Sequence, residues 1–166
     1  MNHYLCREYR QFDDWLKVLQ SAYKTFALPD GWDVERASTC MWASEAADRM
    51  QLPHLAVEWA EKATASAPHF YEMWHWRAHL AFMAENWQDC RDFAIKILEL
   101  ERQDHHLVKP WVWDFAGYDL LALSSSRLNL PNDAIKYGQM ALDGAPPQEI
   151  ERLSANLRDY KATVAN

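Results

Sequence analysis

Apolar positions recur with helical spacing along most of the chain. The segment Ala56-Val57-Glu58-Trp59-Ala60-Glu61-Lys62-Ala63 has three alanines at A-x-x-x-A-x-x-A spacing, which places them on one stripe of a helix. A stripe of small side chains lets a neighbouring helix approach closely, and Pro68 ends this helix. Ala, Leu, Glu and Lys are common, and clusters of β-branched residues are rare. The pattern predicts an all-α protein.

The stripe occurs four times, at successive intervals of 38, 34 and 44 residues, and its middle position is always a small residue: Ala22, Ala60, Ala94 or Gly138. A period near 34 is the length of a tetratricopeptide helix–turn–helix unit. A second column of small residues precedes each stripe by 12 positions, where the first helix of a unit would meet its second helix. The stripes are Val18/Ala22/Thr25, Ala56/Ala60/Ala63, Cys90/Ala94/Ile97 and Ala134/Gly138/Ala141, and the second column is Cys6, Ser44, Ala78 and Ala122.

These columns predict a tetratricopeptide-like right-handed superhelix of about four helix pairs plus a C-terminal capping helix, in a single domain over residues 1–166. The second helix of a pair opens alternately with tryptophan (Trp15, Trp87) and proline (Pro53, Pro131). Proline fits the first turn because its missing N–H would be unpaired there anyway. The expected helices span about 2–11 and 13–26, 33–50 and 53–66, 70–84 and 87–102, 111–128 and 131–143, and 147–164.

Composition and charge exclude several classes of protein. Hydrophobic residues make up 49% and charged residues 25% of the chain, which is typical of a globular domain. The net charge is −7 and no basic stripe is present, so we expect no nucleic-acid partner. No apolar run reaches the ~18 residues of a membrane span, and no signal peptide is visible. Three distant cysteines indicate reduced thiols in a cytoplasmic protein.

A series of short motifs adds a family resemblance. Tyr4-Leu5-Cys6-Arg7-Glu8-Tyr9 resembles the opening of the tetratricopeptide-like tail in many bacterial and phage family-2 glycosyltransferases. The order and spacing of later motifs match the same tail along nearly the whole chain. They are Gly31-Trp32-Asp33 with Glu35-Arg36; Pro110-Trp111; Asp119-Leu120-Leu121-Ala122-Leu123 with Arg127-Leu128; and Asn156-Leu157 with Tyr160.

The resemblance implies a helical domain that holds the acceptor, packs on the catalytic domain or dimerises. In that family the catalytic part is an upstream α/β domain that binds a nucleotide sugar and carries a metal-binding D-x-D motif. No two aspartates of this chain are two positions apart. We therefore expect no catalytic residues, metal or cofactor in this chain, and a glycosyltransferase as its parent or partner.

In a tetratricopeptide-like fold, residues of the first helices line a concave groove, and these are the candidate binding residues. The charge of the candidates changes from basic to acidic along the chain. No stack of Lys and Arg is present to clamp a C-terminal carboxylate, so an acidic peptide tail is a poor candidate ligand. The groove candidates are Arg7, Arg10, Met41, Glu45, Asp48, His75, His79, Phe82 and Asp119, together with His3, Leu123 and Ser126.

Tryptophans supply further candidates. Trp74 and Trp76, like Trp111 and Trp113, are two positions apart and so point to roughly opposite sides of a helix. One indole of each pair is expected to line the groove, an edge or an interface, where it could stack on a sugar or anchor a peptide. The alternative, in which both indoles are buried between repeats, stays equally open. Trp76, Trp111 and Trp113 join the candidates, whereas Trp15, Trp59 and Trp87 are assigned to the core.

Other residue patterns are compatible with metal binding or catalysis, but a structural role is the favoured interpretation of each. His75 and His79 share a helix face and could bind Zn²⁺, but Trp76 stands where the metalloprotease pattern needs glutamate. Polar residues lining a groove are the favoured interpretation. Asp104-His105-His106 is expected to be a solvated loop. Ser124-Ser125-Ser126 lies within a helix, where its hydroxyls favour close packing over nucleophilic catalysis.

Two functional hypotheses follow. The first is a non-catalytic helical-repeat binding or scaffold domain associated with a family-2 glycosyltransferase, for acceptor docking or dimerisation. The second is a free-standing adaptor that binds a peptide or protein partner in its concave groove. An enzyme in its own right is the least favoured interpretation.

Overall fold

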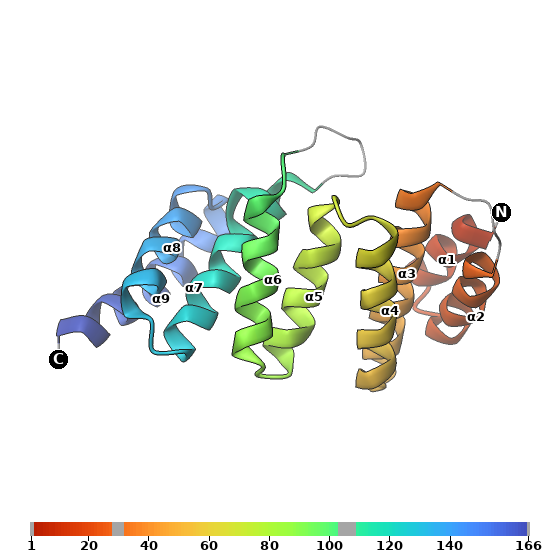
Figure 1. The fold of residues 1–166 in the computed structure, drawn as a ribbon, viewed down its shortest axis with the longest axis horizontal. Helices are drawn as coiled ribbons and strands as arrows, with labels where there is room; N and C mark the ends of the chain where they lie inside the picture. The colour runs from red at the N-terminus through yellow and green to blue at the C-terminus, as the bar shows by residue number, and fades with distance from the viewer. Residues whose placement is uncertain (1, 28–31, 103–108, 166) are drawn as a thin grey trace. The chain divides into compact units, whose positions relative to one another are not determined.

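Every regular element in the described part of the chain is a helix (Figure 1). The computed structural model describes residues 2–27, 32–102 and 109–165. The predicted fold class, all-α and built of tetratricopeptide-like helix pairs with a last helix, is confirmed. In chain order the elements are α1 (Asn2–Gln11), α2 (Trp15–Phe26), α3 (Asp33–Arg49), α4 (Pro53–Ser66), α5 (Tyr71–Met83), α6 (Trp87–Glu99), η1 (Val112–Ala116), α7 (Gly117–Arg127), α8 (Pro131–Asp143), η2 (Pro147–Glu149) and α9 (Ile150–Ala165).

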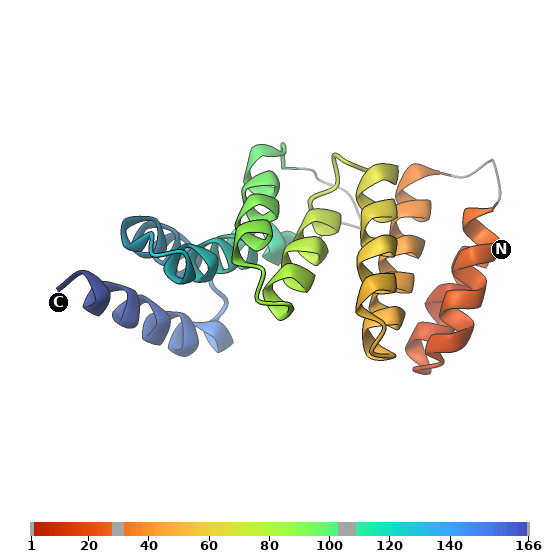
Figure 2. The ribbon, with the colours of Figure 1, turned by 60° about the horizontal axis from the view of Figure 1, so that its bottom comes forward.

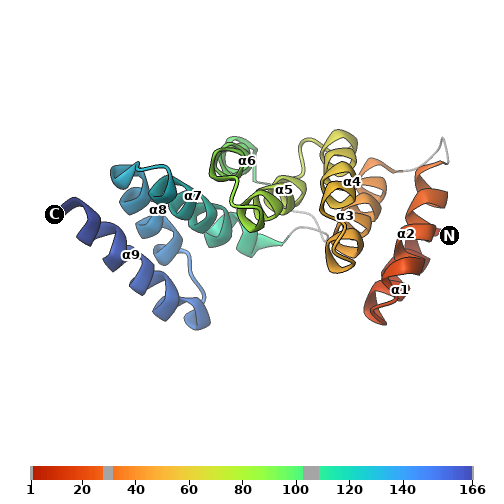
Figure 3. The same ribbon diagram turned by 90° about the horizontal axis from the view of Figure 1, so that it is seen from below.

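The chain divides into two compact units, Met1–Trp76 and Arg77–Asn166, and the division falls within α5. In the first unit α1 packs on α2 and α3, α2 packs on α3, and α3 packs on α4 (Figure 2). In the second unit α6 packs on α7, α7 on α8, and α8 on α9 (Figure 3). That the whole chain forms one domain stays a prediction. No described helix has the length and apolar character that crossing a membrane requires.

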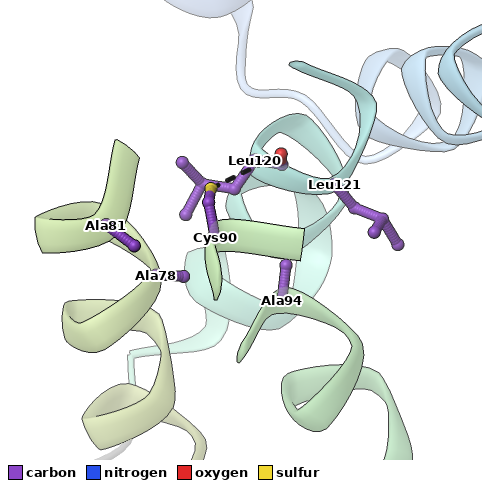
Figure 4. Packing of buried hydrophobic residues seen from close by; sticks show 6 residues of the cluster. All are labelled: Ala78, Ala81, Cys90, Ala94, Leu120 and Leu121. Atoms are coloured by element: carbon purple, nitrogen blue, oxygen red, sulfur yellow. Dashed lines mark hydrogen bonds between the residues drawn. The ribbon is translucent and has the colours of Figure 1, made fainter. Parts of the chain in front are cut away.

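The small-residue columns are buried as the repeat register predicts. All but one of the stripe and second-column residues are buried, and Thr25 is half-buried. Figure 4 shows the column residues Ala78, Cys90 and Ala94 in the core of the second unit. There the Cys90 sulfur lies 4.0 Å from the carbonyl oxygen of Leu120, which places α6 directly against α7. Close approach of backbones is what small side chains permit, so the columns account for the stacking of the pairs.

The turn inside each helix pair holds one non-glycine residue in the left-handed conformation. These residues are Asp13, Gln51, Glu85 and Asn129, with φ of 54°, 59°, 55° and 56°. Their intervals are 38, 34 and 44 residues, the same as those of the small-residue stripes. In each turn the next residue donates to a carbonyl five positions back, as Leu52 N does to Ala47 O at 2.9 Å. This pairing of helix-end carbonyls is a Schellman-type stop, and its fourfold recurrence supports the repeat register.

The second helices of the pairs begin in two alternating ways. In the first and third repeats a side chain caps the helix: Asp14 accepts from Lys17 N, and Asn86 accepts from Asp89 N. In the second and fourth repeats Pro53 and Pro131 stand at the start instead. The first N–H groups of a helix have no acceptor within the helix. A capping oxygen bonds to one of them, whereas a proline has no N–H, so both reduce the number of unpaired donors.

Most helix boundaries lie within two residues of the expected ones, and three differ by more or change the type of helix. The helix expected over 111–128 opens with a π-helical turn, η1, before α7. In this turn the Asp114 carbonyl lies so close to Gly144 that a Cβ there would be 2.0 Å from its oxygen. The helix expected to end at 102 ends at Glu99. The last helix begins at Ile150, after the 3₁₀ turn η2, in which Glu149 N donates to the Pro146 carbonyl over 2.9 Å.

Candidate binding surfaces

In the first two repeats, a polar side chain joins the first helix of a pair to its second helix. The Cys6 thiol donates to the Val18 carbonyl over 3.6 Å, and the Ser44 hydroxyl donates to the Ala56 carbonyl over 2.6 Å. Both bonds join residues 12 positions apart, the predicted separation of the two columns. Cys6 and Ser44 therefore have a packing role. They fix the helices that carry the groove candidates of the first unit.

The groove candidates of the first unit centre on a bidentate ion pair between α1 and α3. Arg10 Nε lies 2.5 Å from Glu45 Oε2, and Arg10 Nη2 lies 3.2 Å from Glu45 Oε1. Two parallel bonds hold the guanidinium in one orientation. Met41 is half-buried, whereas Arg7 and Asp48 are exposed. The structure thus brings Arg10 and Glu45 together and leaves Arg7 and Asp48 in contact with solvent.

His3 is held more firmly than an exposed groove residue would be. Its ring stacks on Trp42 at 4.9 Å, and its Nδ1 lies 2.8 Å from Thr39 Oγ1. The Thr39 hydroxyl already donates to the Glu35 carbonyl, so His3 Nδ1 is the donor in this bond. Burial lowers the pKa of His3, so the neutral ring is favoured.

The candidate residues on α5 are half-buried and contact neighbouring side chains or backbone. Trp76 and Trp74 are both half-buried, and their indole nitrogens donate to Ser44 Oγ at 2.7 Å and to the Pro68 carbonyl at 2.8 Å. His75 and His79 are also half-buried. His79 stacks on Phe82 at 6.4 Å. Among the described residues, no group of three His, Cys, Asp or Glu side chains is placed to hold a metal ion.

In the second unit, a partly buried ion pair joins α7 to α9. Arg152 Nη2 lies 2.8 Å from Asp119 Oδ2 and also 2.8 Å from Glu149 Oε2. The Asp119 side chain is only 13% exposed. Burial raises the pKa of Asp119, and the Arg152 guanidinium opposes this rise. Asp119 is therefore a groove candidate whose carboxylate is already engaged by the last helix.

The tryptophans assigned to the core are not equally buried. Trp59 is fully buried against the ring edges of Tyr23 and Phe26. Trp15 and Trp87, in contrast, are half-buried. Each is covered by an arginine of the next repeat: Arg49 over Trp15 at 5.9 Å, and Arg127 over Trp87 at 5.3 Å. An arginine can cover an indole face favourably while it keeps its charge in water, so these positions do not need complete burial.

Of the other tryptophan pair, Trp111 is the more exposed member. Its side chain is 42% exposed, with the Lys109 ammonium 6.0 Å above the ring, whereas Trp113 is half-buried.

The serine and cysteine side chains named in the sequence analysis lie in the packed interior. Ser124 is buried and donates to the Leu120 carbonyl. Burial raises the pKa of the thiols Cys6, Cys40 and Cys90 to about 11, 12 and 11. Asp104-His105-His106 lies outside the described residues.

The structure also contains two adjoining hollows, lined by the groove candidates Leu123 and Ser126 and by residues that the sequence analysis did not assign to a site. They lie between the end of α7, the start of α8 and the C-terminal half of α9, with volumes of about 150 Å³ and 460 Å³. Ser126, Asn129, Tyr160 and Thr163 line both. The smaller hollow is also lined by Pro131 and Ala134, and the larger by Leu123, Arg127, Asn156 and Asp159. The signal in the sequence was the motif series, which includes Arg127, Asn156 and Tyr160.

Comparisons with known proteins find relatives by structure only. No family model and no curated protein matches the chain. A crystal structure of MamA matches with a TM-score of 0.67 and 17% identity, over 95% of this chain and 88% of that one. A second crystal structure of MamA protein matches with a TM-score of 0.68 and 16% identity, over 98% of this chain and 85% of that one. At this identity the likeness shows the fold alone, and that fold is all-α and tetratricopeptide-like.

Proposed function

We propose that the chain is a helical-repeat scaffold domain that docks on a protein partner, in association with a family-2 glycosyltransferase. The observation that carries this proposal is an exposed surface, called the outer face of α1, formed by Tyr4, Leu5 and Glu8 of α1 and by Phe12 in the turn directly after it. The three helix positions share one side of α1. Tyr4, Leu5 and Phe12 are 54%, 39% and 78% exposed. Three large exposed apolar side chains along α1 and the turn at its end mark a surface that gains free energy when a protein covers it.

The position of the family resemblance along the chain favours a transferase as the partner. The first motif of the series, Tyr4 to Tyr9, lies on α1, which carries Tyr4 and Leu5 and ends directly before Phe12. A transferase catalytic domain that packs on the outer face of α1 would bury Phe12 and Leu5 together. In this role the chain positions the acceptor or joins two transferase subunits. The groove candidates from Arg7 to Asp119, with Trp76, Trp111 and Trp113, are proposed as contacts for the acceptor.

The test measures binding of the purified chain to the catalytic domain of a family-2 transferase from the same source, by isothermal titration calorimetry. Phe12→Ser and Leu5→Ser should each weaken binding at least tenfold, since each removes apolar area from the interface. Gln11→Ser, at an exposed neighbouring position on α1, is the matched control. Binding that is unchanged by Phe12→Ser, with circular dichroism confirming the fold, would remove the outer face of α1 from the proposal.

Dimerisation and catalysis need separate measurements. If the outer face of α1 joins two copies, the chain alone should sediment as a dimer that Phe12→Ser converts to a monomer. The proposal places the chemistry in the transferase, so purified chain should not turn over a nucleotide sugar with or without Mn²⁺. Turnover by the chain alone would contradict a non-catalytic role. A cytoplasmic location is part of the same proposal, and fractionation of the source cells tests it.

The second candidate function is a free-standing adaptor that binds a peptide, and the hollows beside α9 favour it. They are lined by residues of α7, α8 and α9, so a ligand there would contact the last helix pair and the C-terminal helix. The two functions differ in the surface used. Variants of the outer face of α1 should impair transferase docking, whereas variants of the hollow should impair peptide binding.

A further inference from the structure

The hollow of about 150 Å³ in the second unit is small and lined mainly by apolar atoms. Pro131 and Ala134 on α8 and the Tyr160 ring form its apolar lining. Ala134 is 1% exposed and Tyr160 is 6% exposed, so these walls belong to the packed core. The Tyr160 ring is fixed further by Gly138, where a Cβ would lie only 3.1 Å from ring atom Cδ2. An apolar recess with rigid walls suits an apolar group of limited size.

One polar group at this place lacks a hydrogen-bond partner. The hydroxyl oxygen of Tyr160 is buried and makes no hydrogen bond within the described part of the chain. A buried hydroxyl without a partner costs free energy that one hydrogen bond from a ligand would recover. Tyr160 lines both hollows, but its hydroxyl oxygen is closed off from water, so a ligand in the recess bonds to it only after a small shift of the side chains that cover it.

The neighbouring hollow of about 460 Å³ has a lining that suits neutral amides. Asn129 and Asn156 each offer an amide that both donates and accepts, as a peptide group does. The charged residues in the lining are Arg127 and Asp159, which carry opposite charges. The Arg127 guanidinium also lies 5.3 Å over the Trp87 ring, which restrains its position. The lining therefore has no net charge to attract an ion.

We propose that the two hollows together bind an extended, uncharged peptide segment. One small aliphatic side chain enters the apolar recess beside Ala134 and Pro131. The flanking peptide groups bond to Tyr160, Asn129 and Asn156. A monosaccharide suits the recess less well, because it carries a hydroxyl on nearly every carbon and would leave one without a partner among apolar walls. This inference rests on the proposed role in binding a protein partner and names the chemistry of one contact.

The test uses the full chain, ¹⁵N-labelled, in NMR titrations with three capped probes of stated chemistry. N-acetylvaline N-methylamide should shift the amides of Asn129, Ala134, Tyr160 and Thr163 saturably. N-acetylglycine N-methylamide lacks the aliphatic side chain and should bind at least tenfold more weakly. N-acetylglucosamine, which shares only the acetamide, should produce no saturable shift at the same residues. Equal response to the sugar, or none to the valine probe, would overturn the proposal.

Two variants separate binding from folding. Tyr160→Phe removes only the unpartnered hydroxyl, so thermal stability should hold or rise, while affinity for the valine probe should fall about fivefold, the worth of one hydrogen bond. Thr163→Trp fills the hollow from an exposed position on α9 and should abolish binding, whereas Lys161→Trp, exposed on the same helix, should not. If transferase docking survives Thr163→Trp but probe binding never occurs, the scaffold function stands and this inference fails.

Discussion

The indole nitrogen of Trp76 donates to the hydroxyl of Ser44 over 2.7 Å, and that hydroxyl donates in turn to the Ala56 carbonyl over 2.6 Å. One serine therefore connects three helices of the first unit, because Trp76 is on α5, Ser44 on α3 and Ala56 on α4. Ser44 is fully buried, so water cannot replace either bond. The small residue at this column position both permits close packing and completes a hydrogen-bonded relay.

Replacement of Ser44 should show how much the two hydrogen bonds of this relay contribute to stability. Ser44→Ala leaves the Trp76 indole N–H without its hydroxyl acceptor, and the free energy of unfolding in urea should fall by about 1–3 kcal/mol. Ser44→Cys should lose less, because a thiol can still donate weakly, as Cys6 does at the equivalent position. Ser38→Ala on the same helix is the matched control. Equal stability of Ser44→Ala and the control would show that the relay contributes nothing.

Glycine should stabilise the left-handed turn positions. A non-glycine residue with φ near 59°, as at Gln51, carries backbone strain that glycine does not. Gln51→Gly is expected to raise the melting temperature, with a gain of about 0.5–1 kcal/mol after the entropy of the unfolded chain is counted. Asn129→Gly should gain less, since asparagine tolerates this conformation well. Calorimetry that finds Gln51→Gly less stable than the native chain would show that the Gln51 side chain matters more than its φ.

The small-residue stripe should not tolerate a larger side chain. Ala60 is 1% exposed on α4, so Ala60→Leu would force α3 and α4 apart and cost about 1–3 kcal/mol or more. Ala65→Leu makes the same change at an exposed position of α4 and serves as the control. Urea unfolding compares the two. An unchanged midpoint for Ala60→Leu would contradict the tight packing on which the repeat register depends.

Asp119 should make stability depend on pH in an unusual direction. Burial raises its folded-state pKa above the ordinary 3.8, despite Arg152. The folded chain thus binds this proton more tightly than the unfolded chain. The resulting stabilisation is complete below the ordinary pKa and is lost as pH rises through the folded value. Asp119→Asn should therefore increase the free energy of unfolding at ~pH 7 and change it little near pH 4.

Asp119→Asn does not leave Arg152 without an ion-pair partner, and Asp143→Asn serves as its control. Arg152 keeps its bond to Glu149 when Asp119 is replaced, and its side chain is 46% exposed, so it is not left as a buried lone charge. Asp143→Asn, at an exposed position of α8, controls for the change in net charge. A loss of stability at ~pH 7 for Asp119→Asn alone would mean that the ion pair outweighs the cost of burial.

The sequence predicted packing well because packing depends on residue size at fixed spacing. Ala22, Ala60, Ala94 and Gly138 share a repeat register, and all four are buried. The half-burial of Trp15 and Trp87 was missed because it depends on an arginine of the following repeat, far along the chain. Spacing alone does not show which surface side chain will cover an exposed indole face.

The binding surfaces were harder to predict from the sequence, because they too depend on contacts between residues far apart in the chain. Helical spacing places Asp119 on the groove side of its helix, but the contact with Arg152 depends on how α9 docks. The hollows likewise need the distance between the turn at Asn129 and Thr163 on α9, which no local pattern specifies. The π-helical turn that begins at Val112 lies against the distant Gly144, and no local pattern predicted it.

The second column also differs in chemistry between the two compact units. Cys6 and Ser44 each bond a backbone carbonyl of the partner helix, whereas Ala78 and Ala122 at the equivalent positions present only a methyl group. A directed bond breaks when one helix slides along another, but a methyl contact persists over small shifts. In the first unit, sliding of one helix of a pair along the other would therefore break a hydrogen bond, whereas the equivalent positions of the second unit hold no such bond.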